Sequence, residues 1–235
     1  MTPSIRLHVN APLSPGAEVP ATAGQAHYLG SVMRRVPGDA VLLFNGHDGE
    51  WRARIGALRK EKGHFVAEVQ TRPQAPEPDI WLVFAVLKRD ATDLVVEKAT
   101  ELGVSRILPV FTDRTNAARV NLDRLAAIAA EAAEQCERLV VPAIAAPQPL
   151  SALLAAWPAG RRLVVAAERA NAAPIRPLAG PCALIIGPEG GFTPLELDLM
   201  GRHPLVQSAS LGPRILRAET AAIVGLALLQ APQDG

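Results

Sequence analysis

A glycine-rich loop follows an apolar run near the carboxyl end of the chain. The residues Cys-Ala-Leu-Ile-Ile at 182–186 predict a buried strand, and Gly-Pro-Glu-Gly-Gly follows at 187–191. Thr193 and Glu196 then have the spacing of a capping box, with Pro194 at the first helical position. We expect the loop at the carboxyl end of a strand, where open α/β sheets usually bind ligands. The alternative is that its glycines only permit a tight turn.

The residues of this loop argue against two common nucleotide sites. A phosphate-binding P-loop needs Lys followed by Ser or Thr after its last glycine, whereas Phe192 and Thr193 follow Gly191. A dinucleotide fingerprint needs GxGxxG spacing, which is missing, and Glu189 would place a carboxylate beside a pyrophosphate. An acidic, glycine-lined pocket suits instead a cationic cofactor that bears ribose hydroxyls, and S-adenosylmethionine is such a cofactor.

A second strand-to-helix junction carries more charge than a turn between buried elements usually does. Residues 208–221 read as a strand, a Gly-Pro turn and the start of a helix. Four polar residues gather there: Arg214, Arg217, Glu219 and Thr220. They could serve a ligand, or they could form a solvated loop in which Glu219 and Thr220 begin the helix.

Two domains with different patterns must position these residues. Residues 1–73 hold short alternating stretches separated by turn residues, among them a strand, a polar turn and a second strand over 41–58. One helix is expected at 27–36, and the pattern predicts a small, mostly β barrel or sandwich. Three prolines within 71–79 indicate a linker. Residues 74–235 alternate strand-like and helical segments, which predicts an α/β domain with a largely parallel sheet.

Two helices of the second domain show a clear 3.6-residue period. The first is expected at 91–102, and Gly103 is its expected stop. Its apolar face holds Ala91, Leu94, Val95, Ala99 and Leu102. The side chains of Asp93, Glu97 and Glu101 are expected to point to solvent or to a site. In the second, Asn121 is the expected cap, and the apolar face holds Leu122, Leu125, Ala129, Ala132 and Cys136.

Composition indicates a folded chain without export or membrane signals. Its 235 residues are 49% hydrophobic, and no basic stretch with an apolar core stands at the amino terminus. Cys136 and Cys182 lie far apart without CxxC spacing, so we expect no metal site, no disulfide framework and a cytoplasmic location. Residues 1–73 hold nine Lys/Arg against six Asp/Glu, a basic excess too small to indicate nucleic-acid binding by itself.

Several motifs in fixed order resemble the RsmE family of 16S rRNA uridine-N3 methyltransferases. The two loop motifs are Ile-Gly-Pro-Glu-Gly-Gly-Phe at 186–192 and Leu-Gly-Pro-Arg-Ile-Leu-Arg-Ala-Glu-Thr-Ala at 211–221. The resemblance covers nearly the whole chain, continuing through 27–34, Lys88, 97–103, Pro109, Arg114, 131–138 and Pro142.

This resemblance implies a fold and an activity. The fold is a PUA-like, RNA-binding β-barrel domain at 1–73, followed at 74–235 by a SPOUT methyltransferase domain with a mainly parallel sheet and a trefoil knot. The activity is S-adenosyl-L-methionine-dependent methylation of N3 of a uridine in 16S rRNA, within the assembled 30S subunit, by a homodimer. The alternatives are a SPOUT methyltransferase with another RNA target and a non-catalytic RNA-binding or assembly protein, against which the intact pair of loops argues.

The resemblance also implies roles for individual residues. N3 methylation needs removal of a proton and in-line attack on the methyl group, so no covalent nucleophile is required and neither cysteine is expected to be catalytic. Arg217 and Glu219 are the candidates near the reacting base. The expected cofactor residues are Gly187, Glu189, Gly190, Gly191, Leu211, Gly212, Ile215 and Leu216. The expected RNA contacts are Arg6, Arg34, Arg35, Arg114 and Arg138.

Overall fold

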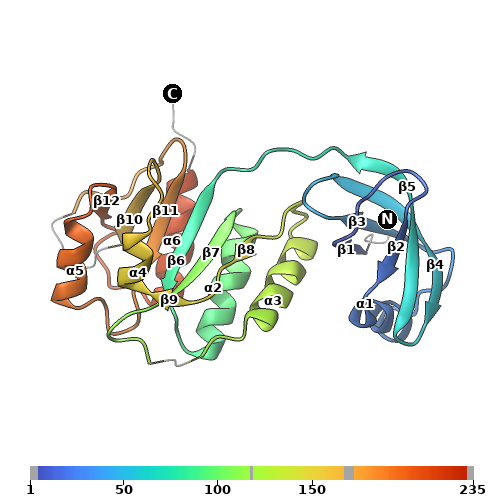
Figure 1. Ribbon diagram of the computed structural model, residues 1–235, viewed down its shortest axis with the longest axis horizontal. Coiled ribbons are helices and arrows are strands. Elements are labelled where there is room, and N and C mark those ends of the chain that lie inside the picture. The colour runs from blue at the N-terminus through green and yellow to red at the C-terminus, as the bar shows by residue number, and fades with distance from the viewer. Residues whose placement is uncertain (1–4, 117–118, 167–171, 232–235) are drawn as a thin grey trace. The chain divides into compact units, whose positions relative to one another are not determined.

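The chain forms two compact units (Figure 1). The computed structural model describes residues 5–116, 119–166 and 172–231. The first unit comprises Met1–Pro76 together with Ala133–Val141, and the second comprises Glu77–Ala132 and Pro142–Gly235. The segment 133–141, which was expected in the second domain, therefore packs with the first unit. Within the described residues, no helix is long and apolar enough to span a membrane.

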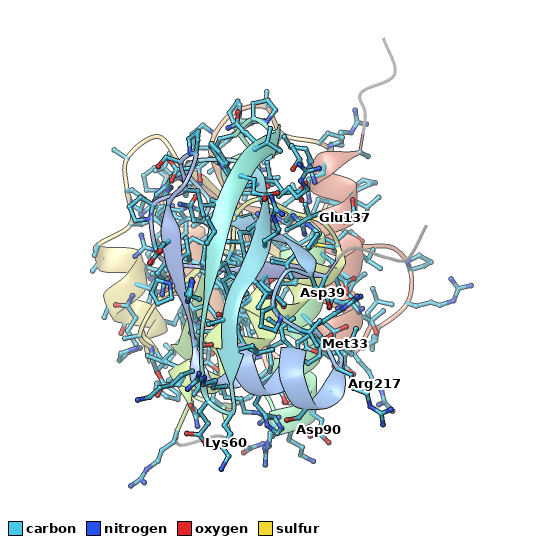
Figure 2. All side chains as sticks on the ribbon, turned by 90° about the vertical axis from the view of Figure 1, so that its right-hand side faces the viewer. Met33, Asp39, Lys60, Asp90, Glu137 and Arg217 are labelled. Carbon is cyan, nitrogen blue, oxygen red and sulfur yellow. The ribbon has the colours of Figure 1, made fainter. Side chains whose placement is uncertain are left out.

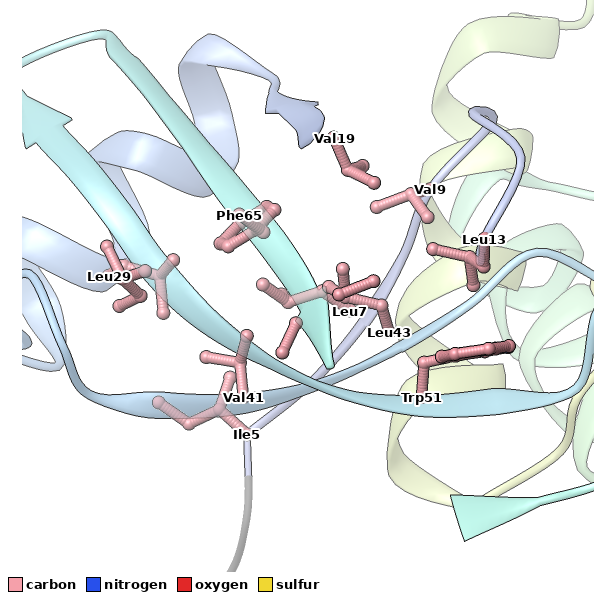
Figure 3. Close-up of a cluster of buried hydrophobic side chains, with 13 residues drawn as sticks. Ile5, Leu7, Val9, Leu13, Val19, Leu29, Val41, Leu43, Trp51 and Phe65 are labelled. Atoms are coloured by element: carbon pink, nitrogen blue, oxygen red, sulfur yellow. The ribbon is translucent and has the colours of Figure 1, made fainter. Parts of the chain in front are cut away.

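The first unit is built around a five-stranded sheet in the order β1-β3-β4-β5-β2. Its strands are β1 (Arg6–His8), β2 (Glu18–Ala21), β3 (Ala40–Phe44), β4 (Glu50–Arg59) and β5 (Lys62–Arg72). Only the pairing of β1 with β3 is parallel. Apolar residues alternate along β4, where Trp51, Ala53 and Ile55 join the core shown in Figure 3. The predicted strand–turn–strand at 41–58 is confirmed.

The helical segment of the first unit is shifted from its prediction. Helix α1 (Ala23–His27) begins at a capping box of Thr22 and Gln25, and it continues into a short π-helix, η1 (Tyr28–Val32). Arg34 follows η1 with a φ of 52°, in the left-handed region. The helix expected at 27–36 therefore begins and ends earlier, and Arg34 and Arg35 lie beyond its end.

Arg6 is buried in the first unit. Its side chain is 5% exposed and its Nε donates to Glu50 Oε2 at 2.7 Å. Its terminal nitrogens donate to the carbonyl oxygens of Ala133, Glu134 and Arg138 at 3.0–3.1 Å. These carbonyls stand at and just beyond the end of helix α3 (Leu122–Gln135), where backbone oxygens lack helical partners.

Two of the expected RNA contacts, Arg6 and Arg138, are buried in this arrangement. Arg6 uses its guanidinium inside the first unit, so it presents no charge to a phosphate. Arg138 is 9% exposed, and its backbone oxygen accepts one of the Arg6 hydrogen bonds. For Arg6, the alternation of Ile5, Leu7 and Val9 predicts a side chain on the polar face of the strand, and this pattern does not reveal that the face is covered.

The second unit contains one parallel sheet, in the order β12-β10-β11-β6-β7-β8 with β9 also paired to β7. Its strands are β6 (Ile80–Ala85), β7 (Arg106–Phe111), β8 (Ala143–Ile144), β9 (Gln148–Pro149), β10 (Arg162–Ala166), β11 (Cys182–Ile186) and β12 (Val206–Ala209). All pairings between these strands are parallel, as predicted. The knot stays a prediction.

Helices cover both faces of this sheet. They are α2 (Arg89–Glu101), α3, the unpredicted α4 (Leu150–Ala155), α5 (Pro194–Gly201) and α6 (Ala218–Gln230). On one face, Ala183 and Ile185 of β11 pack with the core residues of α4 and α5. On the other face, Leu184 meets α6 so closely that a Cβ on Gly225 would lie 2.6 Å from its Cδ2. Gly225 therefore allows α6 to lie close to β11.

The predicted helix faces are confirmed in part. In α2, Val95 and Ala99 are buried as expected, but Thr92 and Thr100 are buried in place of Ala91 and Leu94. Both threonine hydroxyls bond to backbone oxygens, Thr92 to Leu87 and Thr100 to Val96, which makes their burial tolerable.

In α3, the cap and most of the apolar face are confirmed. Asn121 Oδ1 accepts the backbone N–H of Arg124 at 3.0 Å. Leu125, Ala129 and Ala132 are buried, while Leu122 and Cys136 are half-buried.

We predict that Arg6→Met destabilises the protein by about 3–5 kcal/mol, because it removes the buried cation of the Glu50 carboxylate and leaves only the more exposed Arg72, 3.7 Å away, beside it. Urea denaturation measures this loss. Adding Glu50→Leu should recover part of it, since no unpaired charge then remains. Arg52→Met is the matched control, because Arg52 is exposed and pairs with Glu68 on the surface, where such a pair contributes about 0–1 kcal/mol. A loss for Arg6→Met no greater than for Arg52→Met would contradict a structural role for Arg6.

Candidate functional site

The carboxyl ends of the parallel strands meet at one edge of the second sheet. The chain leaves β6 into 86–88, β7 into 112–115, β11 into 187–191 and β12 into 210–217. Because β10 pairs with both β11 and β12, the last two loops flank the end of β10. Ligands of open α/β sheets bind at this edge. The parallel strands therefore bring the two loops singled out in the sequence to the place where a ligand is expected.

The first loop, 187–191, is a tight turn with an exposed tip. The N–H of Gly191 donates to the oxygen of Pro188 at 2.8 Å, and Gly191 has a φ of +70°, which strains any residue with a Cβ. Glu189 and Gly190 are exposed. The capping box of Thr193 and Glu196 is confirmed in the helix that follows, α5.

Polar contacts hold this loop against the loop after β7. Arg114 donates to the oxygen of Gly190 at 2.7 Å, and the Thr193 hydroxyl donates to Asp113 Oδ2 at 3.0 Å. Glu196, 8% exposed, accepts the backbone N–H groups of Asp113 and Thr193. Arg114, an expected RNA contact, is thus exposed but also supports the glycine loop.

The second loop, 210–217, is anchored at its start and exposed along its length. The N–H of Ser210 donates to the Ala173 oxygen, and the Ser210 oxygen accepts from Ile175, both at 2.9 Å. Gly212 has a φ of +124°, and a Cβ there would meet nothing within 4 Å. Ile215 is 60% exposed, whereas Leu211 and Leu216 are half-buried. The loop therefore offers backbone groups and apolar side chains to a ligand.

Arg217 and Glu219 stand at the start of α6. Arg217 is the N-cap residue and is exposed, and Figure 2 shows its side chain reaching outward from the ribbon. Within the described ranges, no hydrogen bond or ion pair engages its guanidinium. Glu219 is half-buried in the first helical turn, where a negative charge stabilises the helix dipole. Arg217 is therefore available to a ligand, while Glu219 also has a structural use.

A cavity of about 640 Å³ opens beside the first of these loops at the end of β6. Glu189 of the first loop lines it, and its other lining residues come from 86–93, from Asn116 and from 119–125. This cavity was not predicted from the sequence. Two of its lining residues could have indicated it from the sequence. Lys88 is part of the family resemblance, and Asp93 was expected to face solvent or a site.

On the first unit, Arg34 and Arg35 lie at a corner where Arg34 is exposed and Arg35 is half-buried. Arg35 is 4.0 Å from Asp39, four residues along the chain. The neighbouring apolar side chains Tyr28, Val32, Met33 and Val36 are exposed. Among the described residues of both units, no group of three or more His, Cys, Asp or Glu side chains is arranged to hold a metal ion.

Two family models each match a part of this chain. A model of the RNA methyltransferase PUA domain matches residues 21–68, and a model of the RNA methyltransferase domain matches residues 74–230. Ribosomal RNA small subunit methyltransferase E of Rickettsia conorii is 33% identical over 94% of this chain and 93% of its own length. The enzyme of the same name from Synechocystis is 33% identical over 92% of this chain and 73% of its own.

Solved structures share the fold of the whole chain. Ribosomal RNA small subunit methyltransferase E of Neisseria gonorrhoeae, solved with S-adenosyl methionine, superposes with a TM-score of 0.86 and 28% identity over 95% of each chain. A Legionella pneumophila protein solved with bound cofactor SAM gives a TM-score of 0.84 and 30% identity over 98% of each chain. This chain belongs to the ribosomal RNA small subunit methyltransferase E family of RNA methyltransferases.

Proposed function

We propose that this protein transfers the methyl group of S-adenosylmethionine to N3 of a uridine in 16S rRNA. The observation that carries the proposal is the pair of exposed glycine loops flanking the end of β10, in a chain whose relatives include proteins solved with this cofactor. The substrate is the 30S ribosomal subunit, which places the protein in the cytoplasm.

The two loops fit the proposed cofactor. Gly191 and Gly212 have positive φ values and open space where a Cβ would lie, so a ligand can approach the backbone. The exposed Glu189 carboxylate suits a ligand that carries positive charge. The proposed cofactor residues are Gly187, Glu189, Gly190, Gly191, Leu211, Gly212, Ile215 and Leu216. When bound, the cofactor supplies a methyl group activated by its sulfonium.

The protein's own contribution is to orient the uridine and to stabilise charge. N3 must lose its proton before it attacks the methyl group, and negative charge then develops on the uracil ring. We propose that Arg217 stabilises this charge, because its exposed guanidinium has no partner within the described ranges. Glu219 is proposed to lie near the base. A covalent route through Cys182 is disfavoured, because this thiol is buried in β11 and burial raises its pKa.

RNA binding and dimer formation complete the proposal. Arg34 and Arg35 on the first unit and Arg114 on the second would contact phosphates. A homodimer would cover apolar surface that the single chain exposes, notably Leu195, Leu197 and Leu199 of α5, which are 42–78% exposed.

We predict that Gly191→Val reduces affinity for S-adenosylmethionine at least tenfold, because a β-branched residue cannot adopt a φ of +70° without distorting the loop. Calorimetry with the full-length protein measures this. Gly160→Val is the matched control, since Gly160 has a φ of +84°, meets nothing within 4 Å, and precedes β10 at the opposite edge of the sheet. Equal cofactor affinity in the two variants would remove this loop from the cofactor site.

We predict that Arg217→Ala slows single-turnover methylation of 30S subunits by about a hundredfold while cofactor affinity is unchanged, because the guanidinium acts chiefly on the transition state. Partial rescue by Arg217→Lys would indicate charge, and no rescue would indicate planar, bidentate geometry. Arg202→Ala, which removes an exposed arginine at the far end of α5, should react at the parental rate. Parental turnover in Arg217→Ala would refute the catalytic role.

We predict that Arg34→Glu with Arg35→Glu weakens binding to 30S subunits and reduces its salt dependence, because a protein that neutralises fewer phosphates releases fewer counterions. Sedimentation at several salt concentrations measures the effect, and cofactor affinity should stay unchanged. Arg59→Glu with Lys60→Glu makes the same charge change at the exposed turn between β4 and β5. If both double variants bind alike, the corner at Arg34 has no specific part in RNA recognition.

A further inference from the structure

The cavity at the end of β6 has the size and composition of a nucleotide site. Its volume of about 640 Å³ is in the range of small-molecule pockets. Its apolar lining comes from Val86, Leu87, Val120 and Leu125, and its polar lining includes Thr92, Asn116 and Asn121. Apolar side chains can contact the faces of a base, and amide groups can bond to its edge.

Hydrogen bonds hold the walls of this cavity in place. The N–H of Val86 donates to the Val110 oxygen at 3.0 Å, which fixes the start of the loop to β7. The Thr92 hydroxyl accepts the N–H of Leu87 and donates to the Leu87 oxygen, which joins the loop to α2. The opposite wall is joined to α2 by the ion pair of Arg124 with Asp93. Because these walls are already held in place, their side chains and loops lose little conformational entropy when a ligand binds.

The charge of the lining favours an anion. Four lining side chains are cationic, namely Lys88, Arg89, Arg119 and Arg124, and two are acidic, Asp93 and Glu189. Asp93 and Arg124 compensate each other as an ion pair. Lys88 and Arg89 are exposed, and no hydrogen bond or ion pair to another described residue engages their side chains. This positive surplus repels the cationic sulfonium cofactor and attracts a phosphate.

We propose that this cavity binds a nucleotide of the RNA substrate, with Lys88 and Arg89 on its phosphate and its base among the apolar residues. The inference rests on the proposed function and adds a substrate site to it. Glu189 belongs to both the cavity and the first glycine loop, so the bound nucleotide would lie beside the proposed cofactor site. Lys88 and Arg89 are then binding residues that orient the RNA.

The test is Lys88→Gln with Arg89→Gln in the full-length protein. Affinity for unmethylated 30S subunits should fall tenfold or more, and the slope of log affinity against log salt should become shallower by about 2, roughly one for each phosphate that is no longer neutralised. Affinity for S-adenosylmethionine should be unchanged, which also shows that the second unit is folded. Arg59→Gln with Lys60→Gln, an exposed adjacent pair on the first unit, removes the same charge and should bind 30S subunits as the parental protein does.

Three results would overturn the assignment. A fall in cofactor affinity with unchanged 30S affinity would indicate that the cavity binds the cofactor. Unchanged affinity for both would leave Lys88 and Arg89 as surface cations. Equal losses of 30S affinity in the two double variants would reflect overall charge alone. A separate measurement tests the proposed function itself: mass spectrometry of 16S rRNA treated with the parental protein. If that function is wrong, this measurement finds no uridine-N3 methylation.

Discussion

The first unit depends on the buried guanidinium of Arg6. Its planar group donates to the Glu50 carboxylate and to carbonyl oxygens of Ala133, Glu134 and Arg138, more than 120 residues along the chain. A buried charge is stable only when such partners are in place. The β domain is therefore complete only when residues 133–141 lie against β1, and a segment encoded within the methyltransferase half belongs physically to the first unit.

A different constraint organises the second unit. All its strand pairings are parallel, so every strand releases its chain at the same edge. Lys88, Arg114, Glu189 and Arg217 come from four separate loops or helix starts, and the sheet gathers them at this edge. Close packing of α6 on β11, which Gly225 permits, holds against the sheet the helix that Arg217 caps.

Charge divides this edge into two parts that suit different ligands. The glycine loops offer backbone groups and the Glu189 carboxylate, which suit a cationic methyl donor. The cavity at the end of β6 has a surplus of positive side chains, which suits an anionic acceptor strand. Methyl transfer requires a donor and an acceptor in contact, and Glu189 lies where the two parts adjoin.

The sequence by itself determined the local elements: the capping box at Thr193, the cap at Asn121, the strand–turn–strand at 41–58 and the parallel class of the second sheet. These follow from residue type and period, which depend on neighbours a few positions apart. Only the tertiary structure decided that Arg6 is buried and that Thr92 and Thr100 replace Ala91 and Leu94 in the core. It also decided that Lys88 and Arg89 face a cavity. In each case the deciding partner is distant in sequence or is a backbone group that accepts a hydrogen bond, and hydrophobic periodicity carries no information about either.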